Sequence, residues 1–453
     1  MGWLTLDQEI HHKAGLLVDG ANIEPAACEG VGETIMEKVW WLFVYDLQKQ
    51  SGLQNIPDYI VFPKGTIVDF RWNPESPYWV RKNDGVTYLE KHGKFVCPIE
   101  FVERPAYYSK TTSSGTPMKT IGTLRGKHGL MACCPLFCSN WVEGGPCKFC
   151  NMNPGMDAYD NKAVVRKKAD EVGEVAAAML AEGIDFHIVI SAGQPPAGRT
   201  TVEEHIEIFE AIKRHTGLEK IPGTDNISPP EDLGQLERLK NTGIQCMFTN
   251  IEIWDPNIFK AMCPGKAKRY GQDHFIKGCE RAAKHWGRGN SWSAMVVGLE
   301  PKESLLEGCK IMAEKGTAML FLPWVPNVGS ELQGHRSPEA AWHVEVQEKA
   351  MDIFEKYLPE VGSEEAYWTQ YGCPSCITIS THHDVHRRRY NIDSEYPAPH
   401  GPKGKFKDEK KGVLAKNLKE LDRFKNGKSA AVISSRESDR KACPVAHPAV
   451  ASS

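Results

Sequence analysis

A regular alternation of short apolar runs and amphipathic segments begins near residue 128 and constrains the fold more than any other feature. Apolar runs typical of buried parallel strands occupy residues 186–190, 244–249, 291–297 and 317–322, with a weaker, Pro222-containing run at 220–224. Helical periodicity marks residues 161–182, 233–243, 272–286, 302–315 and 340–358. Thr200 with Glu203 predicts a capping box at the start of one more helix. Such repeats imply parallel strands with crossover helices, hence a doubly wound sheet or a barrel.

The segments on either side of this repeat differ from it in pattern. The amino-terminal part mixes a helix-like stretch at residues 33–48 with strand-like runs at 59–63 and 94–102, which predicts an α+β module. Proline and glycine are frequent around residues 397–404, which predicts a linker. The pattern of residues 412–424 predicts one amphipathic helix, followed by a frayed tail. The predicted organisation is an α+β module, a barrel core, a helical Cys/His-rich segment and a tail, at residues 1–115, 116–345, 346–400 and 401–453.

Composition narrows the functional class. The 453 residues carry 55 Lys plus Arg against 58 Asp plus Glu, a net charge of -3, which gives no global electrostatic reason to expect nucleic acid or membrane partners. No apolar run is long enough for a bilayer, and the start of the chain lacks the pattern of a signal peptide, so we expect a cytoplasmic protein. In that setting 14 cysteines favour metal or redox chemistry over disulfides.

Five of the cysteines cluster between Cys133 and Cys150, after the first predicted barrel strand and before its helix. Loops at the carboxyl ends of parallel strands are where such folds place their chemistry. Several thiolates on one loop can hold a zinc ion or an iron–sulfur cluster. A structural zinc site would prefer a second pair of ligands nearby. Alternatively, the cysteines could simply be small apolar residues of the core, which is plausible for one or two of them but not for the whole cluster.

The end of this loop, Cys147-Lys148-Phe149-Cys150, resembles the cluster loop of the radical S-adenosylmethionine (SAM) superfamily. There three cysteines bind a [4Fe–4S] cluster and leave one iron open for the amino and carboxylate groups of SAM. The resemblance implies Cys147 and Cys150 as two ligands and Cys138 as the first, with Cys134 as the alternative first ligand. The first ligand is displaced from the usual spacing, because eight residues separate Cys138 from Cys147 and Cys134 lies still farther away.

Further motifs match the superfamily in order along the chain, over roughly residues 128 to 335. The residues that the resemblance assigns to the SAM site are Phe149 near the adenine, the turn Ser191, Ala192, Gly193 and Gln194, the polar pair Asn250 and Glu252, and Gly298. Taken singly, each has a plain alternative, such as a core aromatic, a common strand-to-helix turn or a helix cap. The segment through Pro326 and Gly329 is similar to biotin synthase and the iron-hydrogenase maturase. The implied fold class is α/β, a partial or complete (β/α) TIM-type barrel with an N-terminal α+β module and a C-terminal extension.

The resemblance implies an enzyme in which the reduced cluster cleaves SAM to methionine and a 5′-deoxyadenosyl radical that abstracts hydrogen from a small-molecule substrate. Rearrangement, cyclisation or another modification of a metabolite fits a single evident cluster. It also implies an oxygen-sensitive protein reduced by flavodoxin or ferredoxin. Two other classes stay open: a structural zinc protein with a barrel, and an iron–sulfur protein without radical turnover.

Two carboxy-terminal motifs lie outside this resemblance. Cys373 and Cys376 form a second Cys-x-x-Cys pair that is interpreted as half of an auxiliary cluster or metal site, as a redox couple or as a structural turn. Residues 381–389 hold three histidines and three arginines without metal-binding helical spacing, which favours a solvated or phosphate-facing segment. The Lys-rich run at 403–428 also holds acidic residues and is typical of a solvated surface.

Overall fold

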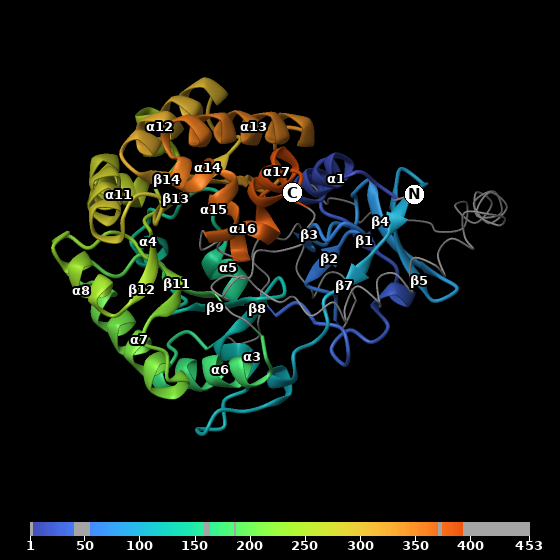
Figure 1. Cartoon of the computed structure of the whole chain (residues 1–453), viewed down its shortest axis with the longest axis horizontal. Helices are drawn as coiled ribbons and strands as arrows, with labels where there is room; N and C mark the ends of the chain where they lie inside the picture. The colour runs from blue at the N-terminus through green and yellow to red at the C-terminus, as the bar shows by residue number, and fades with distance from the viewer. Residues whose placement is uncertain (1–2, 40–54, 158–163, 185–186, 370–373, 393–453) are drawn as a thin grey trace, which may run out of the picture. The chain divides into compact units, whose positions relative to one another are not determined.

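A curled seven-stranded sheet forms the centre of the computed structural model, which describes residues 3–39, 55–157, 164–184, 187–369 and 374–392 (Figure 1). In spatial order its strands are β14 (Thr317–Pro323), β13 (Ser291–Val297), β12 (Ile244–Phe248), β11 (Ile221–Asn226), β10 (His187–Ser191), β9 (Gly129–Cys133) and β8 (Thr123–Arg125). Strands β9 to β14 are all parallel, and β8 adds an antiparallel edge. The predicted α/β fold is therefore confirmed as a half-barrel.

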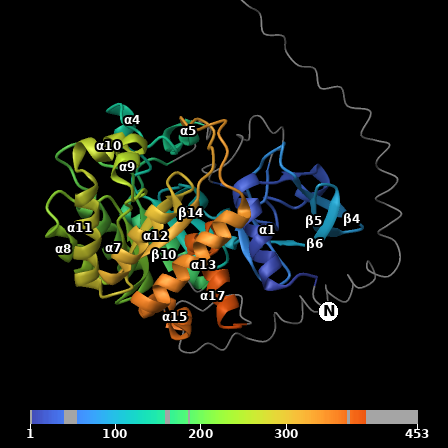
Figure 2. The same ribbon diagram turned by 90° about the horizontal axis from the view of Figure 1, so that it is seen from above.

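Helices cover the outer face of this sheet (Figures 1 and 2). They are α6 (Ala169–Ala181), α7 (Val202–Thr216), α8 (Gln235–Asn241), α11 (Gln272–Trp286), α12 (Lys302–Glu314) and α13 (Ala340–Tyr357). Short helices interrupt the loops at the carboxyl ends of two strands: α4 (Ser139–Val142) and α5 (Met152–Asp157) after β9, and α9 (Pro256–Met262) and α10 (Pro264–Arg269) after β12. The sequence pattern predicted the bounds of α11 and β13 correctly, because a single periodicity and clear flanking glycines define both.

Two predicted helix starts were wrong. The capping box at Thr200 and Glu203 does not form, because the Glu203 carboxylate accepts from Arg238 on α8 instead of from the backbone. The helix predicted over 161–182 begins only at Ala169. Lys167 donates to the backbone carbonyls of Cys133 and Val164 at 2.9 and 2.8 Å, and these bonds hold the preceding chain in an irregular path.

The amino-terminal part contains two small sheets. One consists of β1 (Asn22–Ile23), β4 (Tyr78–Asn83), β5 (Val86–Lys91) and β6 (Lys94–Pro98), and the other of β3 (Ile67–Asp69), β2 (Tyr59–Val61) and β7 (Glu100–Phe101). Helical elements of this part are α1 (Leu6–Asp19), η1 (Pro25–Cys28), η2 (Ala106–Ser109) and α3 (Met118–Ile121). The strands predicted at 59–63 and 94–102 are confirmed.

The helix predicted at 33–48 is wrong where the structure describes it. Residues 33–39 form a turn and isolated bridges, and the Lys38 amide donates to the Ile56 carbonyl at 2.8 Å. The buried Lys38 ammonium lies between Asp58 and Asp69, at 2.9 and 3.1 Å. A buried charge needs such partners, and reaching them keeps the chain extended here. Residues 40–48 lie outside the described part of the chain.

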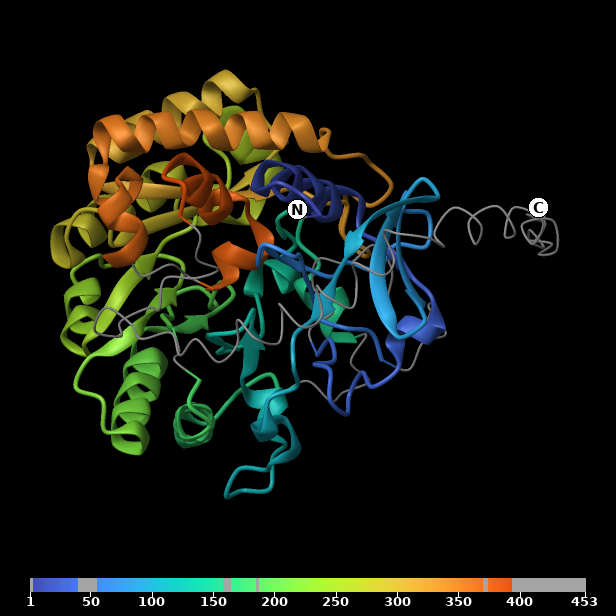
Figure 3. The ribbon, with the colours of Figure 1, turned by 45° about the vertical axis from the view of Figure 1, so that its right-hand side comes forward.

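Four short helices follow α13, and the third of them lies at the open side of the half-barrel (Figure 3). They are α14 (Pro359–Gly362), α15 (Glu364–Thr369), α16 (Pro374–Ile379) and α17 (His382–Arg389). Helix α16 contacts both edge strands of the barrel sheet, β8 and β14, and also β3 of the amino-terminal part. The linker predicted at 397–404 and the helix predicted at 412–424 lie outside the described residues, and the predicted domain boundaries stay predictions.

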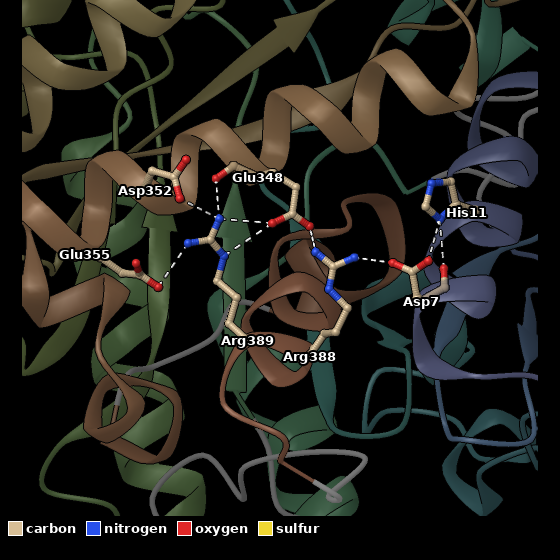
Figure 4. Close-up of polar contacts among 7 residues, drawn as sticks. All are labelled: Asp7, His11, Glu348, Asp352, Glu355, Arg388 and Arg389. Atoms are coloured by element: carbon tan, nitrogen blue, oxygen red, sulfur yellow. Dashed lines mark hydrogen bonds and ion pairs between the residues drawn. The ribbon is translucent and has the colours of Figure 1, made fainter.

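Residues 382–389 are helical and largely buried, so the expectation of a solvated or phosphate-facing segment was wrong. The buried Asp384 carboxylate pairs with the buried Lys13 ammonium of α1 at 2.6 Å. Arg388 pairs with Asp7 of α1 and Glu348 of α13, as Figure 4 shows. Arg389 pairs with Glu348, Asp352 and Glu355 at 3.0, 2.8 and 3.1 Å. The charges therefore join α17 to α1 and α13, a role that short-range spacing does not reveal.

A membrane-crossing segment is not found among the described helices: none combines the required length with the required apolarity.

The Lys13–Asp384 pair gives a stability prediction. Asp384→Asn keeps the side-chain volume but leaves the Lys13 charge buried without its carboxylate, so we expect a loss of about 3 kcal/mol, measured from urea unfolding curves. Lys13→Met combined with Asp384→Leu should recover most of this loss. As a control, Glu345→Gln removes a pair of similar length with Lys302 on the surface and should leave the urea midpoint unchanged. Equal effects of Asp384→Asn and Glu345→Gln would contradict the assignment.

Candidate functional site

A cavity of about 290 Å³ opens at the carboxyl ends of the parallel strands. Its wall takes Cys133 from the end of β9, Ser191 from the end of β10 and Asn226 from the end of β11. The segments that follow β9 and β12 supply further polar residues, among them Asn140, Glu252 and Lys266. This is the edge of the sheet at which a parallel fold is expected to place a ligand.

Cys138, Cys147 and Cys150 all line this cavity and are partly buried. Hydrogen bonds within the loop support them, from the Gly145 amide to the Asn140 carbonyl at 2.8 Å and from the Cys150 amide to the Cys147 carbonyl at 2.9 Å. The Ser139 amide donates to the Gln194 carbonyl at 2.8 Å, which ties the loop to the turn after β10. The structure thus brings the three predicted cluster ligands to one wall.

Burial raises the pKa values of the thiols on this wall. Burial raises the pKa of Cys150 to about 12, and the neighbouring thiols of Cys147 and Cys138 raise it further. Burial also raises the pKa of Cys138, against the opposing effect of the backbone amides of Gln194 and Asn140. A bound metal centre would supply the positive charge that stabilises the thiolates. Within the described ranges, no three Cys, His, Asp or Glu side chains gather closely enough to hold a single metal ion.

Cys134, the alternative first ligand, lies elsewhere. Its side chain packs in a hydrophobic core cluster and does not line the cavity. Its carbonyl accepts from Nε2 of the buried His205 at 2.6 Å, while Nδ1 of His205 lies 2.6 Å from Asp225. The geometry therefore favours Cys138 as the first ligand.

The turn Ser191, Ala192, Gly193 and Gln194 lines the cavity beside the cysteine loop. A Cβ on Gly193 would lie 2.1 Å from the Phe137 carbonyl oxygen and 2.8 Å from the Cys138 Cβ, so only glycine permits this approach. Both polar atoms of the buried Gln194 amide lack a hydrogen-bond partner. Buried polar groups are normally satisfied, so an unpartnered amide at a cavity wall is suited to a polar ligand.

Asn250 and Glu252 line the same cavity from the loop after β12. Glu252 has a left-handed backbone with φ of 72°. Its carboxylate pairs with the ammonium of Lys266 at 2.7 Å, and Lys266 also donates to the Asn250 carbonyl at 2.9 Å. Burial lowers the pKa of Lys266, but the Glu252 carboxylate and the nearby Cys147 and Cys263 thiols outweigh it and raise the pKa overall. An ammonium and a carboxylate therefore stand side by side beside the cysteines.

Of the remaining predicted residues, Phe149 lines the cavity, and its carbonyl accepts from the Asn327 side chain at 3.0 Å. Gly298 does not line it; this glycine has φ of +110° and lies against Pro338 and His343. Cys373 lies outside the described residues, and Cys376 lies in α16, so an auxiliary site there stays a prediction.

Sequence reasoning missed several residues that line the cavity. Lys266 follows β12 by 18 residues, and its only local signal is the sequence Cys263-Pro-Gly-Lys266 at the start of α10. Arg125 comes from the antiparallel edge strand β8, and Trp324 and Asn327 come from the segment after β14. Nothing in the local pattern distinguishes these residues from structural ones, because the fold alone brings them to the cavity.

These side chains fit an iron–sulfur cluster with a polar organic cofactor. Three thiols are the soft ligands that iron–sulfur clusters take. The Gln194 amide, Asn151 Nδ2 and Asn327 Oδ1 are buried at the cavity without a partner in the described structure, and they offer both donors and acceptors.

Comparisons with known proteins bear on this arrangement. No family model matches the chain. Over 281 residues it is 25% identical to the bacteriochlorophyllide c C-7(1)-hydroxylase of Chlorobaculum limnaeum, with 57% of this chain and 70% of that protein covered. The cysteine loop, the turn after β10 and the polar pair after β12 meet at one cavity, in the order expected from the sequence.

Three solved structures also show similarity to this chain. HydG, a maturase of the [FeFe]-hydrogenase, has 14% identity and a TM-score of 0.39, covering 53% of this chain and 52% of that chain. Methylornithine synthase (PylB) has 15% identity and a TM-score of 0.39, covering 70% and 90%. HydG from Carboxydothermus hydrogenoformans has 19% identity and a TM-score of 0.38, covering 56% and 58%. The chain thus spans about half the length of the HydG chains.

The close approach at Gly193 gives a prediction for the cysteine loop. Gly193→Ala should push the Phe137 carbonyl and the Cys138 side chain out of place, so that anaerobically reconstituted protein holds several-fold less iron and sulfide than the wild type. Gly234→Ala is the matched control, because its Cβ would meet only the flexible carboxylate of Asp232. We expect it to retain the wild-type content, roughly four irons for a [4Fe–4S] cluster. A full cluster in Gly193→Ala would show that the close approach is dispensable.

Proposed function

We propose that the chain is a radical SAM enzyme that holds a [4Fe–4S] cluster through Cys138, Cys147 and Cys150 and acts on a small molecule in the same cavity. The observation that supports it most is the convergence of these three thiols with the turn after β10 and the Glu252–Lys266 pair on one cavity at the carboxyl end of the sheet. When bound, the reduced cluster would pass an electron to SAM, and the resulting 5′-deoxyadenosyl radical would take hydrogen from the substrate.

The charged pair suits the amino acid end of SAM. The Glu252 carboxylate can accept from the ammonium group of the cofactor, and the Lys266 ammonium can donate to its carboxylate. The turn Ser191 to Gln194 offers backbone carbonyls and the unpartnered Gln194 amide beside this pair. Phe149 and Asn250 also line the cavity, and Phe149 would pack near the adenine. Gly298 would act only indirectly, through the packing of Pro338 and His343.

The other side of the cavity is apolar and defines the substrate side. Its residues include Leu320 and Leu322 of β14, Trp324 and Val325 after it, and Ile379 of α16. Such a wall excludes water and binds an apolar body, which protects a reactive radical from side reactions. Arg125 lies on the same cavity and adds a cationic group.

The reaction class we propose is a rearrangement, cyclisation or other modification of a metabolite at an apolar carbon. The Chlorobaculum limnaeum relative is by its name a hydroxylase of bacteriochlorophyllide c, and hydroxylation is one such modification. Reduction by flavodoxin or ferredoxin, oxygen sensitivity and a cytoplasmic location belong to the same proposal, without nucleic acid or membrane partners. An auxiliary cluster at Cys373 and Cys376 is not needed for this chemistry.

Cluster content and SAM cleavage test the proposal. After anaerobic reconstitution, wild-type protein should hold roughly four irons per chain, and dithionite with SAM should yield 5′-deoxyadenosine. Cys138→Ala and Cys147→Ala should abolish cleavage, because each removes a ligand. Cys134→Ala is the matched control: it deletes a buried thiol outside the cavity and should keep cleavage at a modest cost in stability.

Other outcomes distinguish the alternatives. Zinc in place of iron would establish the structural zinc protein, and an iron cluster that leaves SAM intact under reductant would establish an iron–sulfur protein without turnover. If Cys134→Ala lost SAM cleavage while Cys138→Ala kept it, Cys134 and not Cys138 would be the first cluster ligand.

A further inference from the structure

The eight residues between Cys138 and Cys147 begin with helix α4, and this segment reaches the protein surface where the helix ends. The last residue of the helix, Val142, is 73% exposed, more than any other large apolar residue that the structure describes. It precedes Cys147 by only five positions. Single exposed apolar side chains are common, so the meaning of this one depends on the surface around it.

The junction between α9 and α10 is bonded to this segment through backbone groups, and Figure 2 shows α4 beside both helices. The Lys148 amide donates to the Met262 carbonyl at 2.9 Å, and the Gly265 amide donates to the Gly145 carbonyl at 3.0 Å. A Cβ on Gly265 would overlap the Gly145 oxygen, so the two backbones are in direct contact. The surface of α9 and α10 is therefore continuous with that of the cysteine loop.

A third segment, the chain after β10, is bonded to α10. Arg269, at the end of α10, donates to the carbonyls of Pro195 and Pro196, the second at 2.6 Å. The Arg199 amide in turn donates to the Pro196 carbonyl at 3.1 Å. Three segments thus adjoin at this face of the protein: residues 139–148, 192–201 and 256–271.

The exposed charge of this face is mainly positive. Its three segments contain a single acidic residue, Glu143. Lys260, Lys268 and Arg199 are exposed, and none of the three forms an ion pair in the described part of the chain. Other exposed lysines are neutralised, for example Lys315, which pairs with a carboxylate of α11 at 2.5 Å. The face therefore combines an exposed apolar side chain with several unpaired cations.

We propose that this donor face, centred on Val142 and bordered by Arg199, Lys260 and Lys268, is the docking surface for a small acidic electron-carrier protein. Opposite charges steer two proteins together, and an apolar centre gives the complex surface to bury. Complexes of electron-transfer proteins are small and weak, so a few cations around one apolar side chain provide enough contact. The step makes and breaks no bond: one electron leaves the reduced carrier and enters the oxidised cluster.

The position and charge of the donor face favour this occupant over two others. Cys138 and Cys147 flank the segment that carries Val142, so a protein seated there lies beside the predicted cluster ligands. A second copy related by twofold symmetry would place the same cations against one another. The net charge of -3 disfavours nucleic acid. The inference rests on the proposed function, because the electron needs a cluster on these cysteines.

Charge reversal tests the donor face in full-length, anaerobically reconstituted protein. The rate of cluster reduction is measured by stopped-flow absorbance after mixing with reduced flavodoxin, an acidic carrier. Lys260→Glu combined with Lys268→Glu should lower the second-order rate constant by roughly tenfold or more at low ionic strength, because attraction becomes repulsion. In about 1 M salt, where the Debye length is about 3 Å, wild type and variant should react at similar rates.

Matched controls separate the donor face from general surface effects. Lys220 directly precedes β11 and Lys284 lies near the end of α11, so both are exposed at the opposite edge of the sheet. Lys220→Glu combined with Lys284→Glu should keep the wild-type rate. Val142→Ser should slow reduction several-fold, whereas Phe95→Ser, at an exposed aromatic residue of β6, should not. Every variant should keep the wild-type iron content and the SAM cleavage that dithionite drives.

The outcomes distinguish the donor face from the proposed function. An unchanged rate after charge reversal at Lys260 and Lys268, or an equal loss in the control pair, would overturn the donor face. A wild type that dithionite reduces and flavodoxin does not would overturn it as well. Sedimentation of a wild-type dimer that the charge reversal dissociates, at an unchanged reduction rate, would assign the face to a second copy. Failure of the wild type to bind iron, or of dithionite to support SAM cleavage, would instead overturn the proposed function.

Discussion

Contact between backbones at two glycines is the constraint on which the site depends. Gly193 allows the turn after β10 to approach the Phe137 carbonyl, and Gly265 allows the α9–α10 junction to approach Gly145. Each contact fixes one end of the cysteine loop against a different barrel strand. A loop of this length would otherwise have to order its thiols at a large cost in conformational entropy. The parallel sheet supplies the fixed frame, since its strands end at one edge and their loops meet there.

The same frame explains the electrostatics of the site. The loop after β12 presents Glu252, while α10, which follows it, returns Lys266 to the same place. The Glu252 carboxylate opposes the effect of burial on Lys266, so the pKa of that ammonium is raised overall. An ion pair already formed at the cavity wall can exchange partners with a charged ligand.

Prediction from sequence succeeded where a local pattern has one explanation. The hydrophobic periodicity predicts the strand β13 and the helix α11 directly, and the cysteine loop can be recognised from its composition. It failed where a distant charge decides the local structure. The chain around Lys38 is not helical, because the Lys38 ammonium must reach Asp58 and Asp69. The Glu203 carboxylate, which was predicted to cap a helix, instead accepts a hydrogen bond from Arg238. Lys266 could not be assigned for a related reason: it lies over a hundred residues from the cysteine loop, and contacts of the folded chain such as the bond between Lys148 and Met262 bring this segment to the loop.

The pairing of α1 with α17 has a consequence for how the protein is made. Lys13 and its buried partner Asp384 are separated by 371 positions in the chain. During synthesis the first helix therefore emerges long before the carboxylate that neutralises its buried ammonium, and it cannot take its final place until nearly all of the described chain has been translated. Helix α16, which contacts both edge strands of the half-barrel, is made at the same late stage. Ile379 of this helix lines the cavity, so the cavity gains part of its wall only late in synthesis, long after the cysteine loop has been made.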